Sequence, residues 1–224
     1  MPRPLRLYVE GLSVHVMHRG INGMQIFDDD DDYSVFLRLV RHGTSIERTD
    51  VHGFALMKNH YHLQATPRDA LALSRAMKRI HTDYSRYYNR KHQRTGTLWG
   101  HRARTVLIED ERQWLTCLRY IDQNPVRAGV VSHPQDYFWS SYRNHALGEP
   151  TSWLVPHPLY LALGASARAR QTAYGAICST PLTASEAALQ RRPLPDRRKQ
   201  RPALAPLTAL EPSEIEPPEM QMLG

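Results

Sequence analysis

The alternation of hydrophobic and polar positions predicts several short strands in the first two thirds of the chain. Residues 11–19 alternate with the period of two that puts successive side chains on opposite faces of a strand. Residues 47–66 hold two more β-like runs separated by a turn at Lys58-Asn59, and residues 97–108 hold a fourth. We therefore expect four strands, of which the middle two form a hairpin.

Three other segments have apolar residues at intervals of three and four, which is the spacing of one helix face. They predict helices over residues 31–42, 69–88 and 109–123, and Pro125 is expected to end the third. The acidic run 28–32 lies at the start of the first helix, where it suits the helix dipole and can cap free N–H groups. A carboxylate metal site is the alternative reading of this run.

The order of these elements, β-α-β-β-α-β-α, contains a split βαβ unit. It predicts an α+β fold, with a ferredoxin-like (RRM-like) antiparallel sheet and helices on one face, over residues 1–145. Residues 146–180 are expected to form a short helical accessory segment. Residues 181–224 contain eight prolines and twelve charged residues, and this tail cannot bury enough apolar surface to offset its ordering entropy. We expect it to be disordered.

Composition narrows the protein class. The chain has 224 residues and only two cysteines, Cys117 and Cys178, which match no metal or redox pattern and are expected to be reduced thiols. It contains neither an apolar run near the ~20 residues of a membrane span nor a signal-peptide core. The expected location is the cytoplasm, without a membrane partner.

The formal charge of +7 is unevenly distributed. Residues 68–104 hold ten Lys or Arg against two Asp or Glu, interleaved with tyrosines, histidines and a tryptophan. Cations and aromatic rings together suit a phosphate backbone with stackable bases, whereas a solvated helix face is the simpler alternative. The candidate phosphate contacts are Arg75, Lys78, Arg79, Arg86, Arg90, Lys91, Arg102 and Arg104.

The segment Asn59-His60-Tyr61-His62 carries the sharpest candidate chemistry. On a strand, His60 and His62 point to the same face, so they form a possible pair of metal ligands, although buried histidines are more often ordinary polar groups.

Tyr120 and Asn124 are four residues apart on the third helix and share a face. If the neighbouring apolar face packs on the sheet, the Tyr120 phenol lies over the histidine pair and Asn124 supplies a third ligand; a core tyrosine is the alternative. Because Asn124 precedes a proline, its alignment with Tyr120 is expected to be imperfect.

Four stretches together resemble one family: HVMHRG, ALMKNHYHLQATP, RYYNRKHQRTGTLWGHRARTVLIED and LRYIDQNPVRAGVV. In this order and spacing, they are similar to the single-tyrosine HUH transposases, specifically the REP-associated tyrosine transposases and related IS200-like insertion-sequence transposases. The resemblance covers roughly residues 8–145. The tail after about residue 178 does not resemble the usual C-terminal region of this family.

The resemblance implies a metal-dependent endonuclease and strand transferase that acts on single-stranded or hairpin (REP-type) DNA through a 5′-phosphotyrosine intermediate. His60 and His62 would be the metal ligands, Asn124 the third ligand and Tyr120 the nucleophile. The implied metal is Mg²⁺ or Mn²⁺, although imidazole ligands also suit zinc. His18 and Arg19 lie in the HRG-type stretch and are further candidates for DNA contact.

Three other functions remain open at this point. The chain is alternatively a non-catalytic nucleic-acid-binding module of ferredoxin-like fold, a hydrolase that uses a metal-bound water, or a domesticated transposase without activity. The sequence leaves open whether it is a monomer or a homodimer.

Overall fold

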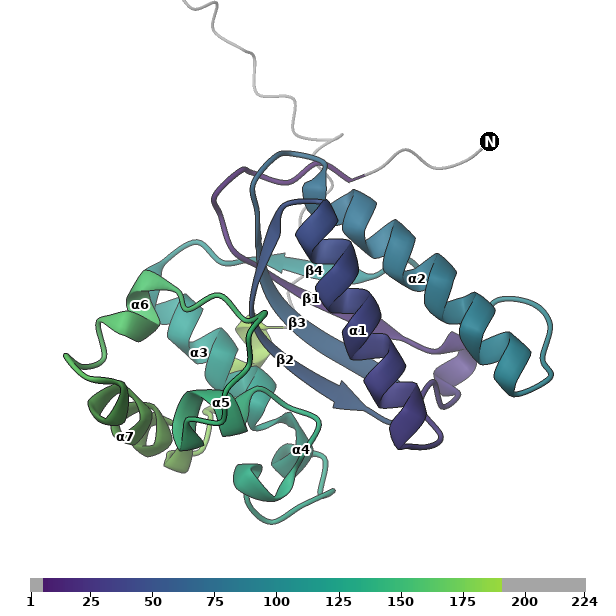
Figure 1. Ribbon diagram of the computed structural model, residues 1–224. Helices are drawn as coiled ribbons and strands as arrows, with labels where there is room; N and C mark the ends of the chain where they lie inside the picture. Colours follow the sequence, from purple (N-terminus) through teal and green to yellow (C-terminus); the bar gives the residue numbers. More distant parts are fainter. Residues whose placement is uncertain (1–5, 191–224) are drawn as a thin grey trace, which may run out of the picture. The chain divides into compact units, whose positions relative to one another are not determined.

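Four antiparallel strands form one sheet with the order β2-β3-β1-β4 (Figure 1). Their bounds are Val14–Arg19 for β1, Thr49–Met57 for β2, His60–Pro67 for β3 and Arg104–Leu107 for β4. The structure is a computed structural model that describes residues 6–190, apart from the side chain of Leu189. Strand order and helix positions confirm the predicted ferredoxin-like α+β fold.

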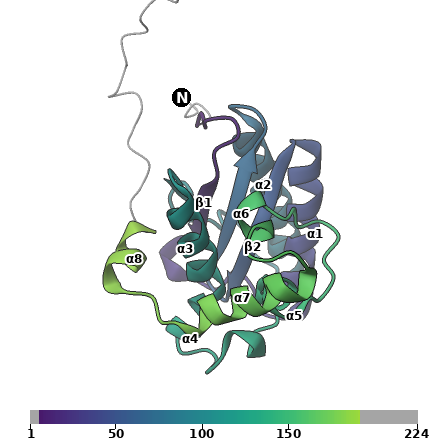
Figure 2. The ribbon, with the colours of Figure 1, turned by 90° about the vertical axis from the view of Figure 1, so that its left-hand side faces the viewer.

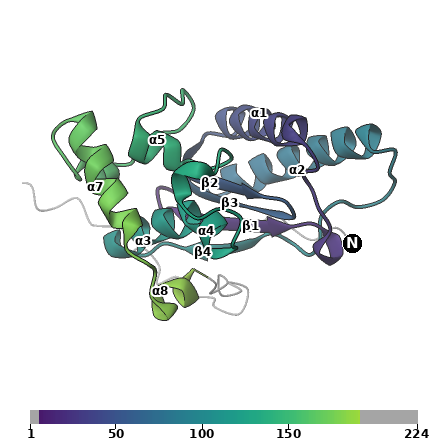
Figure 3. The same ribbon diagram turned by 90° about the horizontal axis from the view of Figure 1, so that it is seen from below.

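Two long helices, α1 (Asp30–Ile46) and α2 (Ala72–Lys91), lie side by side on one face of this sheet (Figure 3). Between them and the sheet lies an apolar core that includes the fully buried Phe36 and Tyr61. Gly43 lets the helices approach closely, because a Cβ there would lie 2.8 Å from Cγ1 of Ile80. Tyr61 therefore points away from the face that carries the two histidines, as the strand period predicts.

A third helix, α3 (Glu111–Asp122), packs on the opposite face of the sheet. The side chain of Asp110 accepts a hydrogen bond from the backbone of Gln113 and so caps its first turn. Gly53 of β2 permits this contact, since a Cβ there would lie 2.3 Å from Cδ1 of Leu118. Helices α1 and α2 thus cover one face of the sheet as predicted, and α3 adds to the other face because it has an apolar side of its own to bury.

Within the described residues five more helices follow α3, and Figure 2 shows the last of them, α8, beside it. Their bounds are Asn124–Arg127 for α4, Tyr142–Leu147 for α5, Pro158–Leu161 for α6, Ala167–Ser179 for α7 and Ala184–Leu189 for α8. Short 3₁₀ turns lie at Ile21–Gly23 and Pro134–Asp136.

The buried carboxylate of Asp122 joins three of the helices that follow the sheet. It accepts hydrogen bonds from Ser141 Oγ and from Tyr174 Oη, each at 2.7 Å, and lies 3.4 Å from Nδ1 of His145. Helix α7, in the segment expected to be an accessory, is therefore attached to α3. The proposed boundary at residue 145 stays a prediction.

Two predicted segments differ from the structure. The fourth strand was expected over residues 97–108, but β4 begins at Arg104, because the chain before it crosses the end of β1 and the Gly100 amide donates to the Arg19 carbonyl. Disorder was expected from residue 181, whereas α8 forms there. Thr183 and Glu186 make a capping box, and Glu186 pairs with Arg119 of α3 at 2.8 Å. Residues 191–224 of that predicted tail lie outside the described residues.

Candidate active site

The two histidines of β3 share the sheet face that α3 covers. Their ring centroids are 5.0 Å apart, and Met17 of β1 pairs with His62 in the sheet register. His62 is 3% exposed and His60 half-buried. The strand period thus places both imidazoles as predicted.

Helix α3 brings Tyr120 to this pair, with its ring centroid 5.8 Å from that of His62. The helix ends at Asp122, and α4 starts at Asn124 with Pro125 in its first turn. Proline therefore begins a new helix here, which its fixed φ and missing N–H allow. Despite this break, Asn124 and His60 line the same cavity.

One cavity of about 320 Å³, called the His–Tyr cavity below, is lined by the four side chains His60, His62, Tyr120 and Asn124. Its walls are formed by His15, Met17, Arg19, His60, His62, Arg104, Val106, Tyr120, Asn124, Arg127, Ala128 and Gln190. Residues from three strands, the end of α3, helix α4 and the residue after α8 therefore meet in a single hollow.

Burial keeps the two imidazoles of β3 neutral. It lowers the pKa of His60 to about 4, with help from the Arg19 charge, and it holds the pKa of His62 well below its usual value. Nε2 of His62 is buried and has no hydrogen-bond partner within residues 6–190. A neutral imidazole with an unused nitrogen, beside a second imidazole and an amide, fits a divalent cation.

Two ionisable side chains of the His–Tyr cavity, His15 and Arg127, were not among the predicted site residues. His15 lies on β1, and its Nε2 is 2.8 Å from Nδ1 of His62. Arg127 lies on α4, with its guanidinium carbon 4.7 Å from the centroid of the Tyr120 ring. The sequence contained an indication of both residues. His15 is four residues before Arg19 on the same strand, so the two side chains point to the same face, and Arg127 continues the helical spacing from Tyr120 and Asn124.

The predicted DNA-contacting cations fall into two groups. Arg19 and Arg104 line the His–Tyr cavity, and Arg102 is exposed just before β4. The others lie on α2, on the opposite face of the sheet: Arg75, Lys78, Arg79, Arg86, Arg90 and Lys91.

Four of the α2 cations have acidic partners. Arg75 pairs with Glu47 at 2.6 Å and with Asp69 at 2.8 Å. Arg79 pairs with Glu47 at 3.4 Å, Arg86 with Asp83 at 3.6 Å, and Lys91 with Asp29 at 2.5 Å. Their role in DNA binding stays a prediction.

His18, the other candidate of the HRG-type stretch, points away from the His–Tyr cavity. It is buried beneath Trp99, with ring centroids 4.8 Å apart, and its Nε2 lies 2.6 Å from the carbonyl oxygen of His101. Its position corrects the expectation that it contacts DNA, because strand alternation turns it toward the α1/α2 layer.

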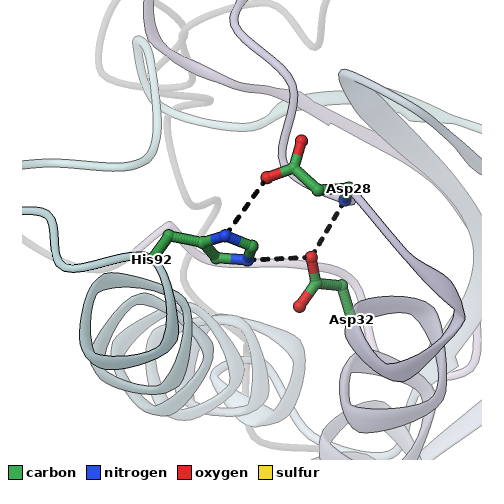
Figure 4. Close-up of side chains that lie close together, drawn as sticks. All are labelled: Asp28, Asp32 and His92. Atoms are coloured by element: carbon green, nitrogen blue, oxygen red, sulfur yellow. Dashed lines mark hydrogen bonds and ion pairs between the residues drawn. The ribbon is translucent and has the colours of Figure 1, made fainter.

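A second group of possible metal ligands, Asp28, Asp32 and His92, lies at the start of α1 (Figure 4). His92 Nε2 is 3.1 Å from Asp32, and Nδ1 is 3.5 Å from Asp28. The Lys91 ammonium lies 3.0 Å from Asp32, which also accepts the Asp28 amide. Because a lysine and N–H donors already satisfy the buried Asp32, this cluster fits a metal less well than the His–Tyr cavity.

Fold and cavity together define an α+β protein that gathers two imidazoles, a phenol and an amide on the sheet face opposite its long helices. Residues 8–124 match the family model described as "Transposase IS200 like". The chain belongs to this family of transposases, which are DNA-processing enzymes.

One solved structure has the same fold, with a TM-score of 0.56. It is described as a REP-associated tyrosine transposase bound to a REP hairpin, is 15% identical, and the match covers 70% of this chain and 93% of that chain. A proposed transposase from Deinococcus radiodurans R1 is 16% identical, with a TM-score of 0.37 over 50% of this chain and 90% of that chain. No curated protein matches. Among the described helices, none combines the length and apolar character needed to cross a membrane.

Proposed function

We propose that this protein is a metal-dependent endonuclease and strand transferase that cuts single-stranded or hairpin DNA through Tyr120. The observation that carries the proposal is that His60, His62, Tyr120 and Asn124 line one cavity of a single chain. Its family membership supports the same activity. We also propose that it acts in the cytoplasm, the location expected from the sequence.

His60, His62 and Asn124 would hold a divalent cation, and Mg²⁺ or Mn²⁺ is the proposed metal. When bound, it supplies Lewis-acid polarisation of a scissile phosphate oxygen, which is typically worth several kcal/mol. Neither imidazole has to lose a proton before it binds a metal near neutral pH, because burial lowers the pKa of both rings.

In the proposed reaction, the Tyr120 oxygen attacks phosphorus in line with the leaving O3′. The P–O3′ bond breaks as the P–O bond to Tyr120 forms, the phenol loses its proton, and the 3′ oxygen gains one. The products are a 5′-phosphotyrosine and a free 3′-OH. A second 3′-OH reverses this step and joins DNA without ATP, because the phosphodiester energy is kept in the linkage.

The cations of the cavity are the proposed phosphate contacts at the cleavage point. Arg19, Arg104 and Arg127 all line it. The structural relative is described as bound to a REP hairpin, so we propose a hairpin with a single-stranded flank as substrate. An exposed backbone is needed because the phenol is held within the cavity.

A labelled single-stranded oligonucleotide with a REP-type hairpin tests this function. Incubated with Mn²⁺ and analysed on a denaturing gel, the wild type should give a labelled band of protein size. Tyr120→Phe should abolish that band, whereas Tyr87→Phe, on the far face of the sheet, should retain it. Cleaved oligonucleotide without a covalent band would point to a hydrolase, and hairpin binding without cleavage would point to a binding module.

Because one chain supplies every residue of the site, we propose that the active site does not need a second protomer. Mixing Tyr120→Phe with a His60→Ala/His62→Ala variant tests this point. No cleavage is expected from the mixture. Recovered cleavage would mean that protomers share sites in a homodimer.

A further inference from the structure

His15 and His62 are diagonal neighbours on one face of the sheet. His15 pairs with Gln64, and Met17 pairs with His62, so the two rings lean toward each other between β1 and β3. Their centroids are 5.1 Å apart, with 23° between the ring planes, and His15 Nε2 lies 2.8 Å from His62 Nδ1. Two buried imidazoles thus share one hydrogen bond.

This hydrogen bond constrains where the protons lie. A neutral imidazole carries a proton on one nitrogen and a lone pair on the other. Both rings are buried, at 2% and 3% exposure, which disfavours their charged forms. Exactly one of the two facing nitrogens must therefore donate, and the choice fixes which nitrogen of His62 is free to bind a metal.

The other nitrogen of His62 shows which arrangement fits the cavity. Nε2 is buried without a partner in the part of the chain that the structure describes. If Nε2 carried the proton, His62 would hold a buried donor with no acceptor near it within residues 6–190. If the proton is on Nδ1, it is donated to Nε2 of His15, and the Nε2 lone pair of His62 is available to a cation. The neutral His15 then carries its proton on Nδ1, which is also buried without a close partner among the described side chains, but the backbone of Gln190 is a polar neighbour of that ring and favours this arrangement.

We propose that His15 is a positioning residue that accepts the Nδ1 proton of His62 and thereby keeps Nε2 of His62 ready to bind the metal. The inference rests on the proposed function, because it concerns the same metal site. Histidine ligands generally depend on such a partner for ring orientation and tautomer.

His15 is poorly placed for a more direct role. Its Nε2 is occupied by His62, and its ring meets Tyr120 edge-on, with centroids 5.6 Å apart. The backbone of Gln190 is a further polar neighbour of the ring. His15 therefore acts through His62 rather than as the base for Tyr120.

Mn²⁺ binding by the full chain, measured by electron paramagnetic resonance of the free ion, tests the inference without DNA. In His15→Leu the acceptor is lost, and we expect about 10–100-fold weaker binding. In His15→Gln the amide oxygen takes the place of Nε2, and we expect affinity within about threefold of wild type, because the hydrogen bond survives. Asp28→Asn serves as a control for binding at the second cluster and should not change the affinity.

The outcomes separate this inference from the proposed function. If wild type binds no Mn²⁺ in the His–Tyr cavity, the proposed metal site is wrong. If wild type binds Mn²⁺ and His15→Leu binds it equally well, only the role of His15 is wrong. The role of His15 is also wrong if folded His15→Gln binds Mn²⁺ as weakly as His15→Leu, since altered packing alone would then explain the lower affinity.

A direct measurement on the wild type covers the case in which His15→Leu does not fold. Long-range ¹H–¹⁵N correlation spectra of the metal-free protein report which ring nitrogen carries the proton. We expect the proton of His62 on Nδ1. A proton on Nε2 of His62 would overturn the inference whatever the variants show.

Discussion

The guanidinium carbon of Arg127 lies 4.7 Å from the centroid of the Tyr120 ring, so a permanent positive charge sits beside the proposed nucleophile. Both side chains line the His–Tyr cavity, one from α3 and the other from α4. In the proposed reaction, this charge faces the phosphate on which negative charge develops.

Replacing Arg127 should therefore slow cleavage. We expect Arg127→Gln to lower the single-turnover rate by about 10–100-fold, since preorganised charges act on the transition state. Arg127→Lys should lose less, because it keeps the charge. Arg168→Gln, an exposed position on α7, is the matched control and should cleave like wild type. Equal rates for Arg127→Gln and wild type would remove Arg127 from the mechanism.

Asn124 should tolerate a carboxylate better than an apolar side chain. Mg²⁺ and Mn²⁺ prefer oxygen ligands, so Asn124→Asp should bind Mn²⁺ at least as tightly as wild type. Asn124→Leu, which is of similar size, should bind roughly tenfold more weakly. Isothermal titration calorimetry measures both. Weaker binding by the aspartate variant would argue against Asn124 as a ligand.

The protein should lose stability in mild acid because of buried histidines far from the His–Tyr cavity. Burial lowers the pKa of His52 from 6.5 to about 4 and holds the pKa of His81 well below 6.5. Below pH 6.5 these histidines are therefore protonated in the unfolded chain but stay neutral in the folded chain. Because the unfolded state binds more protons, the free energy of unfolding falls as pH drops from 6.5 toward 4. The expected slope is about 1.4 kcal/mol per pH unit for each such proton.

Urea unfolding at a series of pH values measures this slope. His52→Gln should reduce it, because the glutamine does not titrate in this range. An unchanged unfolding free energy between pH 6.5 and 4.5 in the wild type would contradict the expectation.

Asp122 should be important for stability rather than for chemistry. Its carboxylate accepts hydrogen bonds from Ser141 and Tyr174, and it is fully buried. Asp122→Ala removes the acceptor of the Tyr174 hydroxyl and the nearer of the two acceptors of the Ser141 hydroxyl, and it should cost roughly 3 kcal/mol of unfolding free energy. Tyr174→Phe removes one bond and should cost about 1–2 kcal/mol. Urea denaturation checks both values, and a cost below about 1 kcal/mol for Asp122→Ala would contradict this role.

Arginines in the cavity and on α2 should differ in DNA binding. Arg19 lines the cavity, whereas Arg86 lies on the opposite face, paired with Asp83 and 75% exposed. We expect Arg19→Gln to reduce the slope of log affinity against log salt by about 0.7 on single-stranded DNA, and Arg86→Gln to change it little. Fluorescence anisotropy at several salt concentrations measures the slope. The opposite result would assign the DNA path to α2, as the charge of residues 68–104 first suggested.

Periodic patterns predicted the core elements of the fold well. The hairpin turn at Lys58-Asn59, the long helices and the ferredoxin-like sheet follow from strand and helix spacing and are present in the structure. The length of β4 was overestimated, because the run from residue 97 has strand-like composition but only Arg104–Leu107 forms a continuous ladder with β1. Residue pattern shows what a segment prefers, and a strand also needs a neighbour to pair with.

The sequence alone determined which side chains share a face: His60 with His62 through the strand period, and Tyr120 with Asn124 through the helix period. It did not determine that α3 covers the face opposite α1 and α2, nor that β1 lies beside β3 and brings His15 to His62. Those relationships depend on strand order and on packing between distant segments, as at Gly53 and Leu118. Local periodicity is set within a few residues of chain, whereas a site built from several elements is decided by the free energy of the whole fold.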